Sequence, residues 1–492
     1  MSSDRVLVVI GRTRHKMVVA ELQEAVKRGA KFIELRLDFL AKAVDFKRLT
    51  PLKQCPWVAT LRRPVDGGRF SGTEEERLMI LRQAIVSGAF EWVDLETDIA
   101  GTVPRFGKVK RIVSYHNTVE TPPDLEDIFA NMLKQDADVC KIAVAAQSPE
   151  DVARVLTLQR TSPKPTVAFC LGDIGQPSRF LALKFGAPWI YAAFNKERGI
   201  APGLPSLDEF RTTYPVQKLG AGTQVFGVLG DPVGHSLSPL LHNHMYKKLG
   251  VDALYLPFRV PRGQLPQALA AYERVPVSGY SVTIPHKESA ASFARESDAT
   301  VEFTGSANTL VRRADGAFAA ANTDLGAIIG SLKSFLAEKA KGDPVPQISQ
   351  LSVLILGAGG AARSAAYGMH REGAQLTIAA RTYERAQKLA EDVKCKAVDW
   401  HARHNVNFDV LINCTPIGMH PNVDEAPCHY SILRPGRIVF DTIYTPETTL
   451  LVREARARGC DTITGVDMFV RQAARQIELF TGRVPDIEVM RV

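Results

Sequence analysis

The sequence predicts an α/β protein with an N-terminal (β/α)8 barrel followed by a two-domain unit that includes a Rossmann-type nucleotide domain. Eight short β-rich runs alternate with amphipathic segments before residue 200, which is the pattern of a compact barrel. Later, a glycine-rich turn joins an apolar strand at 351–356 to an alanine-rich helix, as in nucleotide domains. Residues 202–222 mix Pro, Gly and Thr without strong periodicity, so we place the joint at about 215–222.

Length and composition narrow the class of protein. A chain of 492 residues is too long for one core and indicates two to four domains. No apolar run reaches membrane-spanning length, and the first strand starts too close to the initiator methionine for a leader peptide. Seven scattered cysteines without a C-x-x-C pair favour a reducing cytoplasm over disulfides or a metal site. The formal charge of +8 is dispersed, which favours anionic small molecules over nucleic acid and leaves the oligomeric state open.

The barrel strands are the first elements in chain order. We expect them at residues 6–10, 32–37, 57–61, 92–96, 111–115, 139–144, 166–171 and 189–194. Helical segments are expected between most of them, for example at 18–28, 74–86, 125–135 and 149–159. Chemistry in such barrels sits at the carboxyl ends of the strands. Polar residues gather there: Glu34, Arg36, Asp38, Arg62, Asp66, Asp94, Glu96 and His116.

Lys141 is the most informative residue of the barrel, because it stands among apolar neighbours in the sixth strand. Burial should lower the pKa of this amine toward a neutral, nucleophilic form, which imine chemistry needs. Alternatively, the lysine only pairs with a barrel carboxylate, and His116 by itself could equally be a satisfied core histidine. Together, Lys141 and His116 favour a nucleophile with an acid–base partner.

A second module begins with a strand at 225–229 and a turn that carries Ser236 and Ser238 before a helix at 240–249. Ser238 followed by Pro239 is a typical helix cap, while two hydroxyls at a helix N-terminus also suit a carboxylate ligand. A strand is expected to begin at residue 279, and the turn after it carries a second distinctive lysine, Lys287. Taken singly, Asn308 and Asp324 would be turn or cap residues.

The glycine-rich turn predicts a phosphate cradle, in which backbone N–H groups at a helix N-terminus face a pyrophosphate. Its residues are Gly357, Ala358, Gly359, Gly360 and Ala361. Ala362 stands where the usual third glycine falls. After the next strand, Arg381, Thr382 and Arg385 replace the acidic residue of NAD sites, which favours a 2′-phosphate and therefore NADP(H). An ordinary glycine turn before a solvated basic helix is the alternative.

Residues 1 to about 215 resemble the type I 3-dehydroquinate dehydratases. The matching motifs are Glu34-Leu-Arg36-x-Asp38, Asp66-Gly-Gly, Ser114-Tyr-His116-Asn, Lys141-Ile-Ala-Val and Arg179. The resemblance implies that Lys141 forms a Schiff base with the substrate ketone, that His116 moves the proton, and that Arg179 holds the carboxylate. Glu34, Arg36 and Arg62 would bind hydroxyls or orient partners.

The barrel departs from that family at three positions. Asp66 stands where the family usually has Glu beside the histidine, Leu204 where it usually has Gln, and Leu171 where Met is common. We expect these changes to lower the efficiency of dehydration more than they alter its chemistry.

Residues 223–492 resemble shikimate dehydrogenases along nearly their whole length. The matching stretches include Ser236-Leu-Ser238-Pro, Val282-Thr283-x-Pro-x-Lys287, Ala307-Asn308-Thr309, Asn322-Thr323-Asp324, Asn413-Cys-Thr415-Pro, Asp441 with Tyr444, and Gly465 through Gln472. The resemblance implies a catalytic pair, Lys287 and Asp324. It also assigns Ser236, Ser238 and Tyr444 to the substrate carboxylate, Thr283, Asn308 and Gln472 to ring hydroxyls, and Thr415 and Gly465 to the cofactor. Ala380 replaces the usual Asn before the NADP arginine.

These resemblances imply three domains: 1–218 as the barrel, 223–322 as a substrate domain completed by 466–492, and 323–465 as the NADP domain. The chain would dehydrate 3-dehydroquinate to 3-dehydroshikimate and reduce that to shikimate with NADPH. A quinate or shikimate dehydrogenase with a weakened dehydratase is one alternative. A ligand-sensing regulator without catalysis is the other, although it would be expected to lose Lys141, His116, Lys287 or Asp324.

Overall fold

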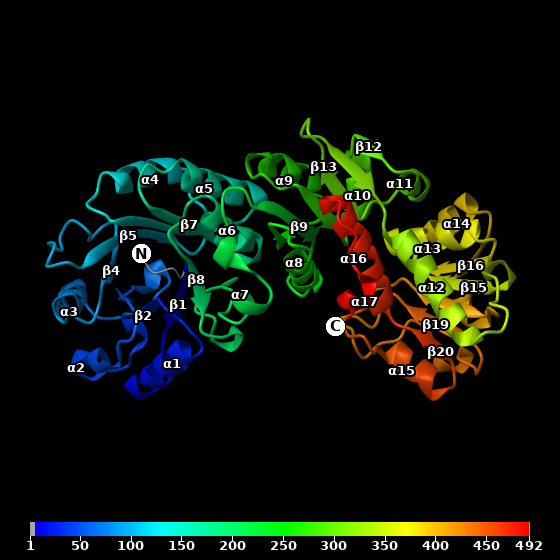
Figure 1. The fold of residues 1–492 in the computed structure, drawn as a ribbon, viewed down its shortest axis with the longest axis horizontal. Coiled ribbons are helices and arrows are strands. Elements are labelled where there is room, and N and C mark those ends of the chain that lie inside the picture. The colour runs from blue at the N-terminus through cyan, green and yellow to red at the C-terminus, as the bar shows by residue number, and fades with distance from the viewer. Residues whose placement is uncertain (1–4, 492) are drawn as a thin grey trace. The chain divides into compact units, whose positions relative to one another are not determined.

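The computed structural model describes residues 5–491 and contains two compact units, the first ending at Val277 and the second beginning at Ser278 (Figure 1). Each is described by itself. In the described part of the chain, no helix is both long and apolar enough to cross a bilayer.

The first unit is built around eight parallel strands. They are β1 (Val6–Ile10), β2 (Ile33–Arg36), β3 (Trp57–Thr60), β4 (Trp92–Glu96), β5 (Lys110–Asn117), β6 (Val139–Ala145), β7 (Thr166–Leu171) and β8 (Ile190–Ala193). Their order is β7-β6-β5-β4-β3-β2-β1-β8, and between residues 5 and 491 no ladder joins β7 to β8. The strands therefore form a nearly closed barrel, which confirms the predicted fold class and the position of every predicted strand to within two residues.

Helices cover the outside of the barrel (Figure 1). They are α1 (His15–Lys27), α2 (Phe46–Leu49), α3 (Glu74–Val86), α4 (Leu125–Leu133), α5 (Pro149–Thr161), α6 (Gly172–Lys184) and α7 (Glu209–Thr212). Capping boxes fix the starts of two of them, Thr73 with Glu76 before α3 and Ser148 with Asp151 before α5. Turns, instead of a helix, join β4 to β5.

The first unit continues past the predicted joint at 215–222. It includes β9 (Gln224–Gly230), α8 (Ser238–Leu249), β10 (Ala253–Arg259) and α9 (Leu265–Ala271), with β9 and β10 parallel. Strand β10 packs on the barrel helix α6, and α9 packs on α5. Arg160 of α5 donates a hydrogen bond to the Arg274 carbonyl at 3.3 Å, and Arg274 forms an ion pair with Glu150. Helix α8 begins at Ser238, so Leu237 occupies the cap position that the sequence pattern assigned to Ser238.

The second unit begins with a small mixed α/β region. Its elements are β11 (Gly279–Val282), α10 (Lys287–Phe293), β12 (Glu296–Ser297), α11 (Ala299–Thr304), β13 (Thr309–Arg312), β14 (Phe318–Ala321) and α12 (Asp324–Ala340). Strand β13 is antiparallel to both β11 and β14. The ends of these strands and the starts of α10 and α12 carry the polar residues discussed below.

A doubly wound domain follows. It contains β15 (Ser352–Leu356), α13 (Gly360–Arg371), β16 (Gln375–Ala380), α14 (Tyr383–Asp392), β17 (Lys396–Asp399), β18 (Val410–Asn413), β19 (Ile438–Asp441), α15 (Leu450–Ala457) and β20 (Asp461–Ile463). The six strands are parallel in the order β17-β16-β15-β18-β19-β20. The order reverses between β15 and β18, where ligands bind in such sheets, so the predicted Rossmann-type fold is confirmed.

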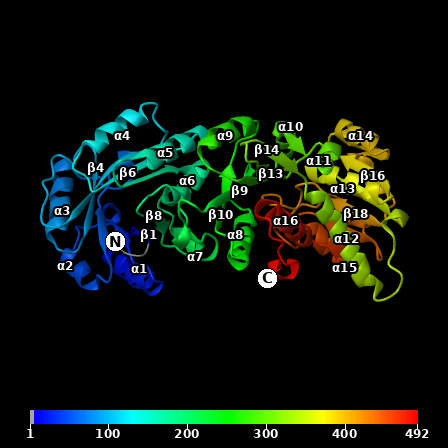
Figure 2. The same ribbon diagram turned by 45° about the horizontal axis from the view of Figure 1, so that its top comes forward.

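The chain ends with α16 (Gly465–Thr481) and α17 (Ile487–Met490). Helix α16 lies against α12, as both ribbon views show (Figures 1 and 2). It also reaches β13 and β11 through Gln476. The buried Gln476 amide donates to the Asn308 carbonyl at 3.0 Å and to Thr309 Oγ1 at 3.1 Å, and its oxygen accepts from Ser281 Oγ at 2.7 Å. The C-terminal helix is thereby fixed to the small α/β region.

Candidate active sites

A cluster of buried charges occupies the carboxyl ends of the barrel strands. Asp94 is its centre: the carboxylate accepts hydrogen bonds from Arg62 Nη2 at 2.7 Å, Lys141 Nζ at 2.9 Å and Ser114 Oγ at 2.5 Å. Burial by itself would raise the pKa of Asp94, but the Arg62 and Lys141 cations outweigh it and hold that pKa below its usual range. The sequence pattern placed Asp94 in the barrel without giving it a role.

Lys141 is almost fully buried, as predicted, yet its pKa moves in the direction opposite to the prediction. Burial lowers the pKa of the amine, but Asp94 at 2.9 Å and Glu34 at 3.7 Å raise it by more, so the net shift is upward. The Tyr191 ring lies 4.5 Å from Nζ and also favours the ammonium. Lys141 is therefore an ammonium in the resting protein, and its amine becomes nucleophilic only after a neighbour takes the proton.

His116 is the neutral base of this cluster. Burial, followed by the charges of Arg62 and Lys141, holds the pKa of its imidazole well below 6.5, so the ring is neutral near pH 7. Arg62 Nη1 donates to His116 Nδ1 at 2.6 Å, which leaves the proton of the neutral ring on Nε2. Nδ1 can accept a proton only when Arg62 releases this hydrogen bond.

Asp66 does not reach the histidine. Its carboxylate accepts from Arg63 Nε at 2.8 Å, whereas the hydrogen-bond partner of His116 within residues 5–491 is Arg62. Asp66 lies in a short 3-10 turn after β3 that ends at Gly67, whose φ of +79° is left-handed. The expected contact between Asp66 and His116 is thus not formed, because the short side chain is held by the adjacent guanidinium.

Three other predicted barrel residues have well-defined surroundings. Glu34 accepts from Thr60 Oγ1 at 2.6 Å, and Arg36 makes two hydrogen bonds of 2.9 Å to Asp38. Arg179 differs from both because no carboxylate pairs with it in the described chain. It donates to the Pro202 carbonyl at 3.0 Å, and burial lowers its pKa to about 10. A buried guanidinium without a counter-ion is suited to bind an anion.

The rim near Arg179 is apolar. Leu171 and Leu204, two of the three departures from the family pattern, pack against the barrel core that includes Phe169 and Tyr191. The guanidinium of Arg179 lies 4.6 Å from the Phe169 ring centroid. Neither leucine side chain can donate or accept a hydrogen bond, so these two residues can contact a substrate only by apolar packing.

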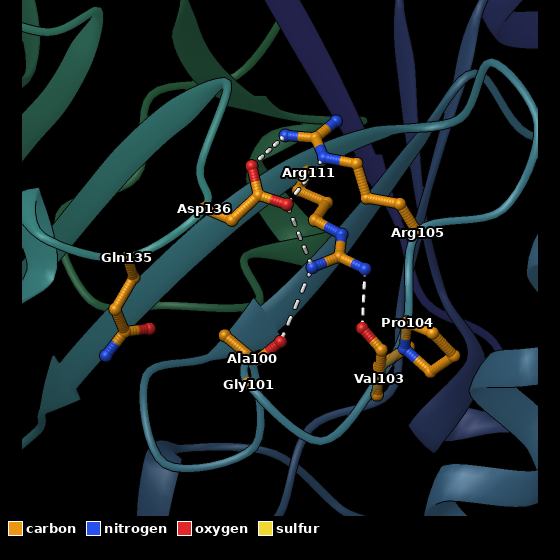
Figure 3. Close-up of a pocket in the computed structure, with 8 residues that line it drawn as sticks. All are labelled: Ala100, Gly101, Val103, Pro104, Arg105, Arg111, Gln135 and Asp136. Atoms are coloured by element: carbon orange, nitrogen blue, oxygen red, sulfur yellow. Dashed lines mark hydrogen bonds and ion pairs between the residues drawn. The ribbon is translucent and has the colours of Figure 1, made fainter.

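A separate cavity of about 400 Å³ lies near the amino end of β5 (Figure 3). Its lining includes Arg105 and Arg111. Arg105 forms two hydrogen bonds of 2.7 Å with Asp136, and Arg111 donates to the carbonyl of Val103. Because these cations are already paired and lie at the opposite strand ends, the cavity has the character of a stabilising ion-pair network.

In the second unit, Lys287 and Asp324 form a direct pair. Lys287 Nζ lies 2.5 Å from Asp324 Oδ2, and Asn308 Nδ2 donates to Asp324 Oδ1 at 2.8 Å. Each of the charged residues begins a helix, Lys287 starting α10 and Asp324 starting α12. The Asn308 oxygen accepts from the Thr323 N–H at 2.9 Å, which fixes the amide orientation. The structure thus brings three predicted residues together.

The other residues predicted to bind substrate lie in different surroundings. Thr283 is half-buried immediately after β11. The Tyr444 ring stacks on Phe469 with centroids 4.3 Å apart. Gln472 donates to the Phe469 carbonyl of its own helix at 2.9 Å. Gln476, one turn further along and not predicted, makes the contacts to β11 and β13 described above. Ser236 and Ser238 lie in the first unit, where Ser236 Oγ accepts from the Ser238 N–H at 3.2 Å.

The glycine-rich turn has the geometry of a nucleotide loop. Gly357 has a φ of +118°, and a Cβ there would lie 3.1 Å from the Cys414 carbonyl oxygen, so only glycine is accommodated without strain. A Cβ at Gly359 would meet nothing within 4 Å, so the start of α13 is open to an anion. Ala358 and Ala361 flank the pair Gly359 and Gly360.

The residues predicted to read the 2′-phosphate lie where β16 passes into α14. Arg381, Thr382 and Arg385 are all exposed, and Arg385 pairs with Glu288 at 3.0 Å. Thr415 is held by the Asn413 oxygen, which accepts from its N–H at 3.0 Å and its hydroxyl at 2.7 Å. These surroundings suit an NADP(H) cofactor, because exposed cations follow β16 and an open helix start follows β15, which borders the switch point of the sheet.

Gly465 has a packing role. A Cβ at this position would lie 2.4 Å from the Ile443 carbonyl group, so the start of α16 can approach the end of β19 only as glycine. Its predicted contact with the cofactor stays a prediction.

Models of known families match successive segments of the chain. Residues 6–220 match the model of type I 3-dehydroquinase. Residues 228–310 match the substrate-binding domain of shikimate dehydrogenase, 336–423 the shikimate/quinate 5-dehydrogenase model and 465–491 the C-terminal domain of shikimate 5′-dehydrogenase.

Individual relatives give the same result. A bifunctional 3-dehydroquinate dehydratase/shikimate dehydrogenase of Arabidopsis thaliana, described as chloroplastic, is 38% identical over 95% of this chain and 80% of its own length. A shikimate dehydrogenase (NADP+) of Methanosarcina barkeri is 37% identical over 54% of this chain and 96% of its own. A crystal structure of a shikimate dehydrogenase with NADP+ matches at a TM-score of 0.50 and 33% identity, covering 55% of this chain and 94% of that one. The chain therefore belongs to the family of bifunctional 3-dehydroquinate dehydratase/shikimate dehydrogenases.

Proposed function

We propose that this protein catalyses two successive steps of the shikimate pathway, the dehydration of 3-dehydroquinate to 3-dehydroshikimate and its NADPH-dependent reduction to shikimate. The observation that carries the proposal is that one chain holds a buried Lys141–Asp94–Arg62–His116 cluster in a barrel and a Lys287–Asp324 pair beside a nucleotide loop. The first step requires an amine and a proton carrier, and the second a proton donor near a hydride source.

In the barrel, Lys141 Nζ attacks the ketone once its proton has moved to a neighbour, and loss of water gives an imine. The imine acidifies the adjacent C–H bond, and His116 Nδ1 accepts that proton after Arg62 turns to a substrate hydroxyl. His116 then protonates the departing hydroxyl, and water releases the product from Lys141. Arg179, without a carboxylate partner, holds the substrate carboxylate. Glu34 and Arg36 would contact hydroxyls, and Asp66 would act only indirectly, through Arg63.

In the second unit, Lys287 protonates the oxygen of the ketone, and Asp324 holds the ammonium in place. NADPH supplies the hydride. Asn308, Thr283 and Gln472 would bind ring hydroxyls, while Tyr444, Ser236 and Ser238 would bind the carboxylate. For the cofactor, residues 357–361, Thr415 and Gly465 would contact the body of the nucleotide, and Arg381, Thr382 and Arg385 the 2′-phosphate.

Domain limits and location complete the proposal. We retain domains 1–218, 223–322 with 466–492, and 323–465 as catalytic divisions, which the limits of the matched family segments support. Seven free cysteines support a reducing compartment, for which we propose the cytoplasm.

The decisive experiment gives the purified protein 3-dehydroquinate with NADPH as the sole addition. We expect shikimate to form, with an enone absorbance that rises and then falls as NADPH is consumed. Quinate and shikimate tested side by side in the oxidative direction then decide between the two dehydrogenase substrates. Failure to form the enone, with normal reduction of added 3-dehydroshikimate, would exclude the dehydratase half of the proposal.

The dehydration step should be insensitive to pH near 6.5. Because the pKa of His116 is held well below 6.5, the base stays unprotonated as the pH falls through that value. We therefore expect kcat/KM for dehydration to decline only in more acidic solution. Initial-rate assays at constant ionic strength, from about two pH units below the ordinary histidine pKa to about two above it, measure this. An acid limb centred at or above 6.5 would contradict the assignment of His116.

Cofactor choice should depend on Arg381. Replacing Arg381 by Asp puts a carboxylate beside the 2′-phosphate, and loss of a charge-assisted contact should weaken NADPH binding by about 10- to 100-fold. NADH affinity should change much less. Fluorescence titration of both cofactors measures the ratio, with Arg453→Asp as a control of equal charge change on α15. Unchanged NADPH affinity in Arg381→Asp would refute this assignment.

A further inference from the structure

Gly360, the first residue of α13, faces the stem of Lys287. A Cβ added at Gly360 would lie 2.7 Å from Ser306 Oγ, 3.0 Å from Lys287 Cδ and 3.4 Å from Lys287 Cβ. The adjacent Gly359 is different, since a Cβ there would meet nothing within 4 Å. The two consecutive glycines of the nucleotide loop therefore differ. The space beside Gly359 is open, whereas the space beside Gly360 is occupied by Ser306 and by the stem of Lys287.

The elements around this contact are fixed to one another. The Lys287 carbonyl accepts from the Ala307 N–H at 2.9 Å, while its ammonium is bound to Asp324. Asn322 Nδ2 donates to the Ser306 carbonyl at 2.7 Å and to Ser364 Oγ of α13 at 3.1 Å. Helix α13, the loop at Ser306 and the start of α12 are thus joined by buried hydrogen bonds.

This arrangement decides which atoms would move if position 360 carried a methyl group. Ser306 is fully buried and its backbone is held by Asn322, so only rotation of its hydroxyl, which has no hydrogen-bond partner among the described residues, could relieve that contact inside the packed interior. The Lys287 stem is flexible and remains partly exposed. A methyl group at 360 would therefore displace the lysine stem, and with it the ammonium relative to Asp324 and to the nucleotide loop.

We propose that Gly360 is a positioning residue for Lys287: the missing side chain at 360 sets the place of the proton donor relative to the loop that carries the hydride source. Glycines in such loops are ordinarily explained by the approach of a phosphate or by helix–strand packing. Here the space is used by a side chain of the reaction itself. The inference rests on the proposed role of Lys287 in the reduction.

The test compares Gly360→Ala with Gly359→Ala and with the double variant Gly360→Ala/Ser306→Ala. For Gly360→Ala we expect kcat of the dehydrogenase to fall about tenfold, because small displacements of a reacting group are costly, while the Kd for NADPH changes by less than about threefold. Gly359→Ala should show the reverse, a weakened Kd with a smaller effect on kcat. In the double variant the removal of Ser306 Oγ makes room for the methyl group, so kcat should partly recover.

A thermal double-mutant cycle between Gly360→Ala and Lys287→Ala keeps the inference testable if Gly360→Ala is poorly stable. Removing most of the lysine stem should reduce the loss of stability caused by the methyl group. Additive losses, or a double variant at Ser306 no more active than Gly360→Ala, would overturn the inference. If Lys287→Ala itself left reduction unchanged, the proposed function of the second unit would fail instead.

Discussion

Lys141→Ala should lose dehydration by at least about 10⁴-fold, because the proposed imine forms on the amine of Lys141. No adduct should be trapped by borohydride in the presence of 3-dehydroquinate, whereas the unaltered protein should gain the mass of the reduced substrate. The variant should still fold, since Asp94 keeps its hydrogen bonds to Arg62 and Ser114. Mass spectrometry and the enone absorbance measure the two losses.

The same chain supplies the controls for Lys141→Ala. Reduction of added 3-dehydroshikimate should continue at the normal rate. Lys134→Ala removes a lysine from the end of α4 and should leave both activities intact. Retained dehydration in Lys141→Ala would remove the Schiff-base assignment, and a trapped adduct in that variant would place the imine on another lysine.

Lys287→Ala should have the largest effect on the second activity. Loss of a positioned proton donor typically costs about 10²- to 10⁴-fold, and we expect kcat for the reduction to fall in that range. Affinity for NADPH should change little, because the lysine supplies no cofactor contact in this proposal. Asp324→Asn keeps the shape of the pair and should give a smaller loss, since Asn308 can still orient the side chain.

Lys333→Ala is the matched control for Lys287→Ala. Lys333 lies on α12 and pairs with Glu372 on the surface, so its loss removes one charge without touching the Lys287–Asp324 pair. Single-turnover reduction with pre-bound NADPH separates chemistry from binding. A loss confined to KM in Lys287→Ala would show that the lysine binds substrate without donating a proton.

Sequence patterns located the strands because these depend on local periodicity, and they placed the candidate site residues on those strands and turns. Alternating apolar runs position Lys141 in β6, and the strand–glycine–helix pattern positions Gly357 at the switch point. The pKa of Lys141 could not be predicted in the same way. Its direction depends on Asp94, 47 positions away in sequence and 2.9 Å away in space.

The sequence did not predict the hydrogen-bond partner of a side chain where two neighbouring residues could each form the contact. Asp66 could face His116 or Arg63, and only the turn ending at Gly67 decides for Arg63. Gln472 and Gln476 lie one helical turn apart on α16, so periodicity places both on one side of the helix. Tertiary packing makes Gln476 the residue that joins α16 to β11 and β13.

The packing of β10 onto α6 and of α9 onto α5 means that the family boundary and the boundary between compact units differ in this chain. The matched family segments divide it between residues 220 and 228. Physical packing divides it between Val277 and Ser278. A truncation at the homology boundary would uncover the faces of α5 and α6 and strip Arg160 and Glu150 of their partner Arg274. The first elements after the family boundary therefore belong, by their packing, to the same compact unit as the barrel.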